Sequence, residues 1–322
     1  MRVLVTGMGG ELGTRIALLL AADPGVGEII GIDVDPPRRR VKATFHRIDP
    51  RDRRRIVNVV RDFAPEAVVH AGIYEPDARS TPRSAEERTR AGTLAMLGSA
   101  AETGALRRLV VRSGIEVYGR ARGGVSVPDE DVPPDPTSHY GRMLLEVEQL
   151  AAASGRSADV PVTAVRMAPV AGPHFPSPLG RYLRLPVVAF SFVGDPPFSV
   201  LHQQDAAAAM VAALHVDHDG PLNVAGAGAS TAAQAARLGG RVALPVTGAP
   251  AWAVVRRTCE LMGAPIPSHV LELLRRGRAA DATSAASVLG CRPAHSTVDV
   301  VKAVYEWAPV TPLRLVGEGE AA

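Results

Sequence analysis

The chain has 322 residues, of which 46% are hydrophobic, and its formal net charge is +3. Because the basic residues are spread along the chain rather than clustered, the charge pattern argues against nucleic acid and membrane surfaces as partners. No apolar run reaches the roughly 18 residues that span a bilayer, and no leader-like segment precedes the first predicted strand. We therefore expect a cytoplasmic protein whose partner is a small molecule. The oligomeric state that we consider for it is a homodimer.

Short apolar runs alternate with longer helical stretches through the first half of the chain. Runs of uniform hydrophobicity are typical of strands buried on both faces of a parallel sheet. The alternation predicts an α/β fold with a Rossmann-type doubly wound parallel sheet. The predicted strands are residues 2–6, 28–33, 67–70, 109–111 and 162–167, and the predicted helices are 11–22, 51–63, 82–103 and 137–154.

The pattern changes at the proline-rich segment 172–178, where regular structure must break. We predict a dinucleotide-binding domain over residues 1–172, a smaller substrate-binding region over 173–315 that is interleaved with the core, and a frayed tail over 316–322. Later helices are predicted at 203–215, 230–240, 250–262 and 281–290, with short strands near 198–201 and 221–224.

A glycine motif follows the first predicted strand directly and opens the first predicted helix. Gly7, Gly10 and Gly13 fit GxxGxxG, in which missing side chains permit a tight turn and a close approach of the backbone to a pyrophosphate. The backbone amides at the start of the helix, around Glu11 and Leu12, would then meet the phosphates.

The two cysteines, Cys259 and Cys291, form no CxxC pair and show no metal-ligand spacing with histidines, so we expect no metal site.

Asp33 ends the second predicted strand, 20 residues after Gly13, where an acid would bind the adenosine ribose hydroxyls. Its charge would repel a 2′-phosphate and favours NAD over NADP. Two alternatives stay open: Asp33 is a turn residue before Pro36, or the basic run 38–40 meets a 2′-phosphate instead of lying in solvent.

Several further segments occur in an order that resembles the extended short-chain dehydrogenase/reductase family, which contains nucleotide-sugar epimerases, dehydratases and decarboxylases. The resemblance implies a nucleotide sugar as substrate, Tyr140 facing the nicotinamide, and cofactor contacts from Asp49, Pro50, Ala71, Gly72, Met167 and Val170. The segments are Thr6–Gly13, Asp49–Asp52, Val68–Gly72, Ser113–Gly119, His139–Gly141, Arg166–Pro173, Leu201–Asp205 and Leu289–Pro293.

The chain departs from the family at two catalytic positions. Leu144 stands where a Lys, four residues after Tyr140, would lower the pKa of the tyrosine and hold the nicotinamide ribose. A tyrosine without that help titrates near 10, so about one in a thousand is ionised at neutral pH. Gly114 stands where the family has Ser or Thr, and Ser113 is one position off, which turns its side chain to the other face of an extended segment.

The catalytic candidates are therefore Tyr140, Glu116 and Ser113. Glu116 lies where dehydratases of the family place a proton-abstracting Glu, and the alternative is a loop carboxylate paired with an arginine such as Arg112 or Arg120.

The candidates for substrate binding are Arg181, Arg184 and His202. The alternative is that both arginines lie in solvent and that the histidine is packed beneath the cleft.

Two functions stay open. One is an epimerase- or dehydratase-like enzyme of atypical mechanism, with a nucleotide sugar or a related hydroxylated molecule as substrate. The other is a catalytically lapsed NAD(P)-binding protein with a regulatory or assembly role. Tyr140 and Glu116 favour the first, whereas Leu144 and Gly114 favour the second.

Overall fold

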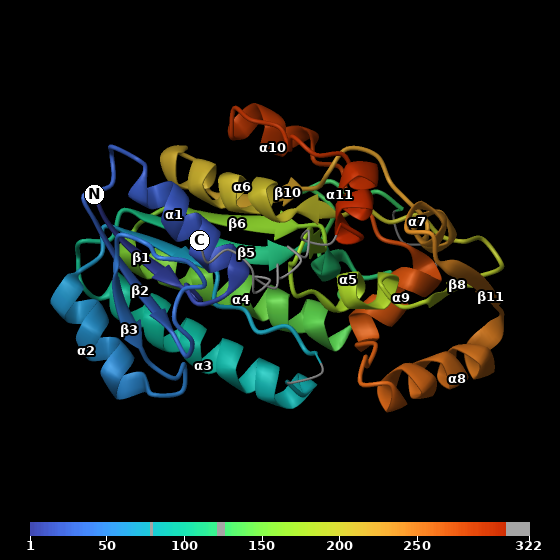
Figure 1. The fold of residues 1–322 in the computed structure, drawn as a ribbon. Coiled ribbons are helices and arrows are strands. Elements are labelled where there is room, and N and C mark those ends of the chain that lie inside the picture. Colours follow the sequence, from blue (N-terminus) through green and yellow to red (C-terminus); the bar gives the residue numbers. More distant parts are fainter. Residues whose placement is uncertain (78–79, 121–125, 307–322) are drawn as a thin grey trace, which may run out of the picture.

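In a computed structural model, which describes residues 1–77, 80–120 and 126–306, seven parallel strands form the central sheet (Figure 1). The strand order is β10-β6-β5-β4-β1-β2-β3, so the chain crosses over between β3 and β4, as doubly wound sheets do. This confirms the predicted fold class. The strands are β1 Arg2–Thr6, β2 Glu28–Asp33, β3 Thr44–Arg47, β4 Ala67–His70, β5 Arg108–Gly114, β6 Val162–Met167 and β10 Gly220–Val224.

Helices cover both faces of the sheet because successive strand residues point to opposite sides. Val3 and Val5 pack in one core cluster with α1 (Glu11–Ala21) and α6 (Gln203–His215). Leu4 points the other way, into the cluster under α2, α3 and α4. These three helices span Arg53–Phe63, Pro82–Ala101 and His139–Ala158.

The smaller region has its own apolar core, which includes Phe198, Trp252 and Leu273. Its helices are α5 Pro178–Leu183, α7 Ala232–Leu238, α8 Gly248–Leu261, α9 Ser268–Arg276 and α11 Thr297–Val304. Two small parallel sheets join β7 (Val170–Ala171) to β9 (Leu201–His202) and β8 (Val187–Ser191) to β11 (Val242–Val246).

The chain returns to the large sheet after leaving it. β10 pairs with β6, α6 packs on α1, and α10 (Thr283–Val288) packs on β10. The smaller region is therefore built from segments that alternate with parts of the sheet domain, and a division at residue 172 stays a prediction. The predicted tail 316–322 lies outside the described residues.

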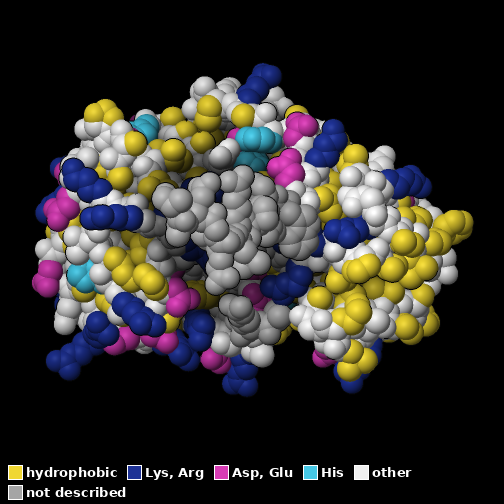
Figure 2. Space-filling view, in the orientation of Figure 1, with side chains coloured by type: hydrophobic (Ala, Val, Ile, Leu, Met, Phe, Trp, Pro, Cys, Tyr) yellow, Lys and Arg dark blue, Asp and Glu magenta, His cyan; other side chains and the backbone are white. Residues whose placement is uncertain are grey.

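Apolar side chains gather on the smaller region, where Figure 2 shows them over the part of the molecule that holds β8, β11 and α8. Val242, Val254 and Leu261 are among the exposed hydrophobic residues there. Within the described ranges, no helix combines the length and apolar character that crossing a bilayer requires.

Candidate active site

The glycine loop between β1 and α1 is packed so closely that side chains would not fit. Gly7 has a φ of +70°, and a Cβ added there would lie 2.7 Å from the Cα of Gly72. A Cβ on Gly13 would lie 2.0 Å from the carbonyl oxygen of Gly7. Gly10 caps α1 without a side-chain hydrogen bond, so the first-turn amides keep their capacity to bind an anion. This loop fits the pyrophosphate of a dinucleotide.

The side chains of the two residues after Gly10 are engaged elsewhere, so the cofactor contacts predicted for these residues would be made by their backbone. Leu12 is buried in the core. The Glu11 carboxylate pairs with Arg15 at 2.8 Å and lies 4.0 Å from Arg38 and from Arg39. These two arginines of the basic run therefore stand beside the loop, paired with an acid.

Asp33 lies at the end of β2, directly over the glycine loop. Its carboxylate accepts the Gly9 N–H at 2.9 Å, the Val34 N–H at 2.6 Å and the Tyr74 hydroxyl at 3.3 Å. Burial nonetheless raises the pKa of Asp33, outweighing the hydrogen bonds that lower it. The carboxylate thus lies beside the glycine loop, and it also makes the local bond to Val34 that a turn residue makes. Its binding of a ribose stays a prediction.

The other predicted cofactor residues surround the same edge of the sheet. Ala71 and Gly72 follow β4 and pack against Gly7. A hydrogen bond from Arg51 lowers the pKa of Asp49 to about 2, and Pro50 packs against Gly92 of α3. The residues thus gather at the carboxyl ends of the parallel strands, where open α/β sheets bind their ligands.

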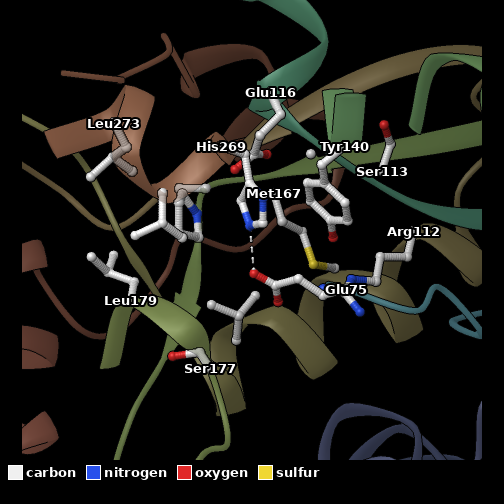
Figure 3. A pocket seen from close by; sticks show the side chains of 15 residues that line it. Glu75, Arg112, Ser113, Glu116, Tyr140, Met167, Ser177, Leu179, His269 and Leu273 are labelled. Atoms are coloured by element: carbon white, nitrogen blue, oxygen red, sulfur yellow. Dashed lines mark hydrogen bonds and ion pairs between the residues drawn. The ribbon is translucent and has the colours of Figure 1, made fainter. Parts of the chain in front are cut away.

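A small cavity of about 30 Å³ opens beside Tyr140 (Figure 3). Predicted residues in its wall are Tyr140, Glu116, Ser113, Met167 and Val170. The wall consists of Glu75, Arg112, Ser113, Gly114, Glu116, Tyr140, Met167, Ala168, Pro169, Val170, Ser177, Leu179, His269, Val270 and Leu273.

Tyr140 lies in the first turn of α4, which begins because Ser138 caps it by accepting the Gly141 N–H at 3.0 Å. Burial is the main cause that raises the pKa of the Tyr140 phenol, and the carboxylates of Glu75 and Glu116 raise it further. Arg112 acts in the opposite direction. At neutral pH this tyrosine is a hydrogen-bond donor and a poor base.

Leu144 occupies the next turn of α4 and is 1% exposed. It packs in an apolar cluster with Val117 and Met143. At the position where the family has a catalytic lysine, this chain thus has Leu144, whose side chain belongs to the core.

Glu116 fills the space that the glycine at position 114 leaves open. A Cβ on Gly114 would lie 2.4 Å from Oε2 of Glu116 and 3.0 Å from Cδ1 of Leu144. Oε1 of Glu116 lies 3.6 Å from Nη1 of Arg278, which is 2% exposed. The partner of this carboxylate is therefore Arg278, rather than the Arg112 or Arg120 considered from the sequence.

Ser113 lines the cavity, but its hydroxyl is engaged by Glu148, and its catalytic role stays a prediction. Its hydroxyl donates to Oε1 of Glu148 at 2.5 Å, and the same carboxylate binds Arg166 through two hydrogen bonds of 2.9 and 2.7 Å. The hydroxyl points away from Tyr140 in Figure 3. The alternation of strand β5 explains this, because Arg112 and Gly114 face one side and Ser113 the other.

Two of the three predicted substrate residues also have other roles. Arg184 donates to backbone carbonyls, at 2.9 Å to Val304 and 3.4 Å to Gly172. His202 caps α6, because its Nδ1 accepts the Gln204 N–H at 3.3 Å, and it is buried. Neither lines the cavity with Tyr140, and their roles in substrate binding stay predictions.

Arg181 lies 4.0 Å from Asp77 and also does not line that cavity. Its role in substrate binding stays a prediction.

One group of three possible metal ligands occurs within the described ranges: His202, Asp205 and His295. Its members bind one another. The two imidazole rings stack at 3.9 Å, and the Asp205 carboxylate pairs with Nδ1 of His295 at 3.0 Å. The expectation of no metal site stays a prediction.

Sequence reasoning missed Glu75 and His269 in the cavity wall and Arg278 beside Glu116, and it considered Arg112 only as a partner of Glu116. Arg112 could have been found, since it lies two residues before Gly114 on one strand and therefore shares its face. His269 comes from α9, a helix that the sequence pattern did not reveal, so no signal in the sequence pointed to it.

The family model of the NAD dependent epimerase/dehydratase family matches residues 3–225. The chain belongs to this family. It is also 30% identical, over 97% of its length and 85% of theirs, to uncharacterized proteins of Mycobacterium tuberculosis and Mycobacterium bovis. The resemblance drawn from the motifs is thereby confirmed.

Solved structures of the epimerase fold superpose on most of this family member. UDP-glucuronic acid 4-epimerase from Bacillus cereus, in complex with UDP-glucuronic acid and NAD, matches with a TM-score of 0.73 and 19% identity over 95% of this chain and 98% of that one. UDP-glucose 4-epimerase from Stenotrophomonas maltophila, with bound NAD and formylated UDP-arabinopyranose, matches with a TM-score of 0.73 and 22% identity over 95% and 97%. These likenesses establish the fold.

Proposed function

We propose that the protein is an NAD-dependent enzyme of the epimerase or dehydratase type that acts on a nucleotide sugar or a related hydroxylated molecule through an atypical set of catalytic groups. The observation that carries the proposal is that Tyr140 and Glu116 line one cavity in a protein whose glycine loop fits a dinucleotide. The superposed epimerases bind NAD and UDP-sugars, which supports the same ligands here.

The chain's own residues have separable tasks in this proposal. When bound, NAD supplies a hydride acceptor and donor. Asp33 binds the ribose and favours NAD over NADP. The Tyr140 hydroxyl donates a hydrogen bond to the reacting oxygen, and Glu116 faces the neighbouring carbon, where a carboxylate can exchange a proton. Arg112 balances the two carboxylates that face Tyr140.

The test is to incubate the purified protein with NAD and a panel of nucleotide sugars, following the absorbance of reduced cofactor and the identity of the sugar. We expect one sugar to be converted, and Tyr140→Phe to lose most of that conversion. NAD should raise the melting temperature more than NADP does.

A catalytically lapsed NAD(P)-binding protein with a regulatory or assembly role is the second candidate, because Leu144 and Gly114 replace two catalytic residues of the family. It predicts that NAD raises the melting temperature while no sugar is altered. Leu144→Lys would then create conversion where none existed.

A homodimer and a cytoplasmic location also remain proposals. Light scattering of the purified protein tests whether it is a homodimer.

A further inference from the structure

His269 is the most unusual side chain of the cavity outside the predicted set. It comes from α9, is 3% exposed, and its ring lies against that of Tyr140, tilted by 31° with 4.4 Å between centroids. Its Nε2 lies 2.9 Å from Oε1 of Glu75, the contact drawn as a dashed line in Figure 3. Two segments almost 200 residues apart in the sequence thus meet at the phenol.

The two ring nitrogens of His269 have different surroundings. Glu75 accepts a hydrogen bond, so it assigns the proton of the neutral ring to Nε2 and leaves Nδ1 with a free lone pair. Nδ1 is buried and has no hydrogen-bond partner in the described part of the chain. A buried polar atom without a partner is uncommon in folded proteins and calls for an explanation, such as a ligand that supplies the missing partner.

We infer that His269, oriented by Glu75, is the proton-carrying group of this cavity and that its Nδ1 binds the reacting hydroxyl of the substrate. The inference rests on the proposed function and deepens it. A base oriented by a third group that binds its other nitrogen is the arrangement that activates histidines in many enzymes.

The other candidates suit this task less well. Tyr140 is buried beside two carboxylates and has no lysine, so its phenol keeps its proton. Glu116 is held by the buried Arg278. An imidazole, by contrast, ordinarily titrates near 6.5 and can take up and return a proton around neutral pH.

Charged groups line the cavity together with His269: Glu75 after β4, Glu116 of η1 (Ile115–Tyr118) and Arg112 of β5. Among them, the carboxylate of Glu75 is in direct contact with the His269 ring, at 2.9 Å.

The proton and electron balance is complete with NAD as the hydride acceptor. The carbon that bears the reacting hydroxyl loses its hydrogen with the bonding pair to NAD, the O–H proton passes to Nδ1 of His269, and the C–O bond becomes a carbonyl. The reverse transfer returns hydride to the carbon and the proton from Nδ1 to the oxygen. Tyr140 donates a hydrogen bond to the same oxygen throughout.

The kinetic test compares His269→Gln, which can still bind Glu75, with Tyr140→Phe and with His218→Gln as a matched histidine outside the cavity. We expect His269→Gln to lower kcat by roughly 10²–10⁴-fold, the range of general acid–base catalysis, while KM stays within a few-fold. His218→Gln should keep the wild-type kcat. Full kcat in His269→Gln, alongside inactive Tyr140→Phe, overturns the inference and leaves the proposed function standing.

The ¹⁵N spectrum of the imidazoles decides the question without turnover, so it applies even if no nucleotide sugar is converted and the proposed function fails. The neutral ring of His269, identified by the signal lost in His269→Gln, should carry its proton on Nε2. A neutral ring protonated on Nδ1 would overturn the inference.

Discussion

At position 114 the absence of a side chain lets the Glu116 carboxylate fold back against β5, with Oε2 2.4 Å from where a Cβ would stand. We predict that Gly114→Ser, which restores the family residue, displaces the Glu116 carboxylate and overpacks the space beside β5. It should lower the free energy of unfolding by about 1–3 kcal/mol and reduce turnover at least about 10-fold. Urea unfolding and sugar conversion measure the two effects.

The matched control for this substitution is the neighbouring Ser113→Ala. Its hydroxyl binds Glu148 on the other side of the strand, so we expect a loss of about 1 kcal/mol of stability with turnover retained. Gain of turnover in Gly114→Ser would show that Glu116 has no role at this position.

His70 predicts a pH dependence of stability. It is fully buried between two hydroxyls, with 2.7 Å from Nδ1 to Thr6 Oγ1 and 2.9 Å from Nε2 to Thr93 Oγ1, and burial lowers its pKa to about 4. Between pH 6.5 and 4, His70 is protonated in the unfolded chain but stays neutral in the folded protein. The free energy of unfolding therefore falls as the pH falls. His70 accounts for a decrease of about 3 kcal/mol in the free energy of unfolding across this interval, and the decrease is absent above pH 6.5.

Urea unfolding of wild type and His70→Gln at pH 7.5 and 4.5 measures this contribution. The wild type should lose more stability than the variant over that interval, since other titrating groups are common to both. Equal losses would mean that His70 is protonated in the folded protein.

Individual site residues were predictable where local patterns determine their direction. The period of two along β5 turns the Ser113 hydroxyl away and brings Arg112 in, and the spacing after the glycine motif placed Asp33 at the end of a strand beside the glycine loop. The pairing of Glu116 with Arg278 and of His269 with Glu75 was not predictable, because each joins segments more than 150 residues apart whose approach depends on tertiary packing.

At the scale of elements, the β1–loop–α1 unit depends on glycine for contact rather than for flexibility alone. We predict that Gly13→Ala, whose Cβ would lie 2.0 Å from the Gly7 oxygen, forces α1 away from the loop. It should weaken NAD binding at least about 10-fold and cost about 1–3 kcal/mol of stability. Calorimetric titration with NAD and urea unfolding provide the measurements.

A matched glycine in α3 gives the opposite expectation. A Cβ on Gly98 would meet nothing within 4 Å, so Gly98→Ala should raise stability by about 0.4–1 kcal/mol, because alanine restricts the unfolded chain. Unchanged NAD affinity in Gly13→Ala would refute the role of the close contact.

Elements were predictable in proportion to their burial. Strands β1, β2, β4 and β6 are continuous apolar runs and were found, as were the long helices over them. Strand β3 is a half-exposed edge of four residues, and β8 and β11 form a small sheet with exposed positions, so their sequences lack that signal. The short helices α5, α9 and α11 are stabilised by the apolar core of the smaller region rather than by local pattern.

For the whole molecule, the return of the chain to the large sheet leads us to expect that residues 1–172 do not fold as an independent unit. A fragment of residues 1–172 lacks β10 and α6, which leaves β6 as an open edge and uncovers the core residues that Met210 and Leu214 contact. We predict that this fragment lacks a cooperative unfolding transition, as followed by circular dichroism in urea. A sharp transition with native-like helix content would contradict this prediction.

The same return has a consequence for synthesis on the ribosome. Strand β6 leaves the ribosome well before β10, since the chain between them builds part of the smaller region first. At about 5–20 residues per second, several seconds pass before the partner strand exists. During that interval the nascent chain presents an unpaired apolar strand, so chaperones that bind such edges should associate with it until residue 224 has emerged.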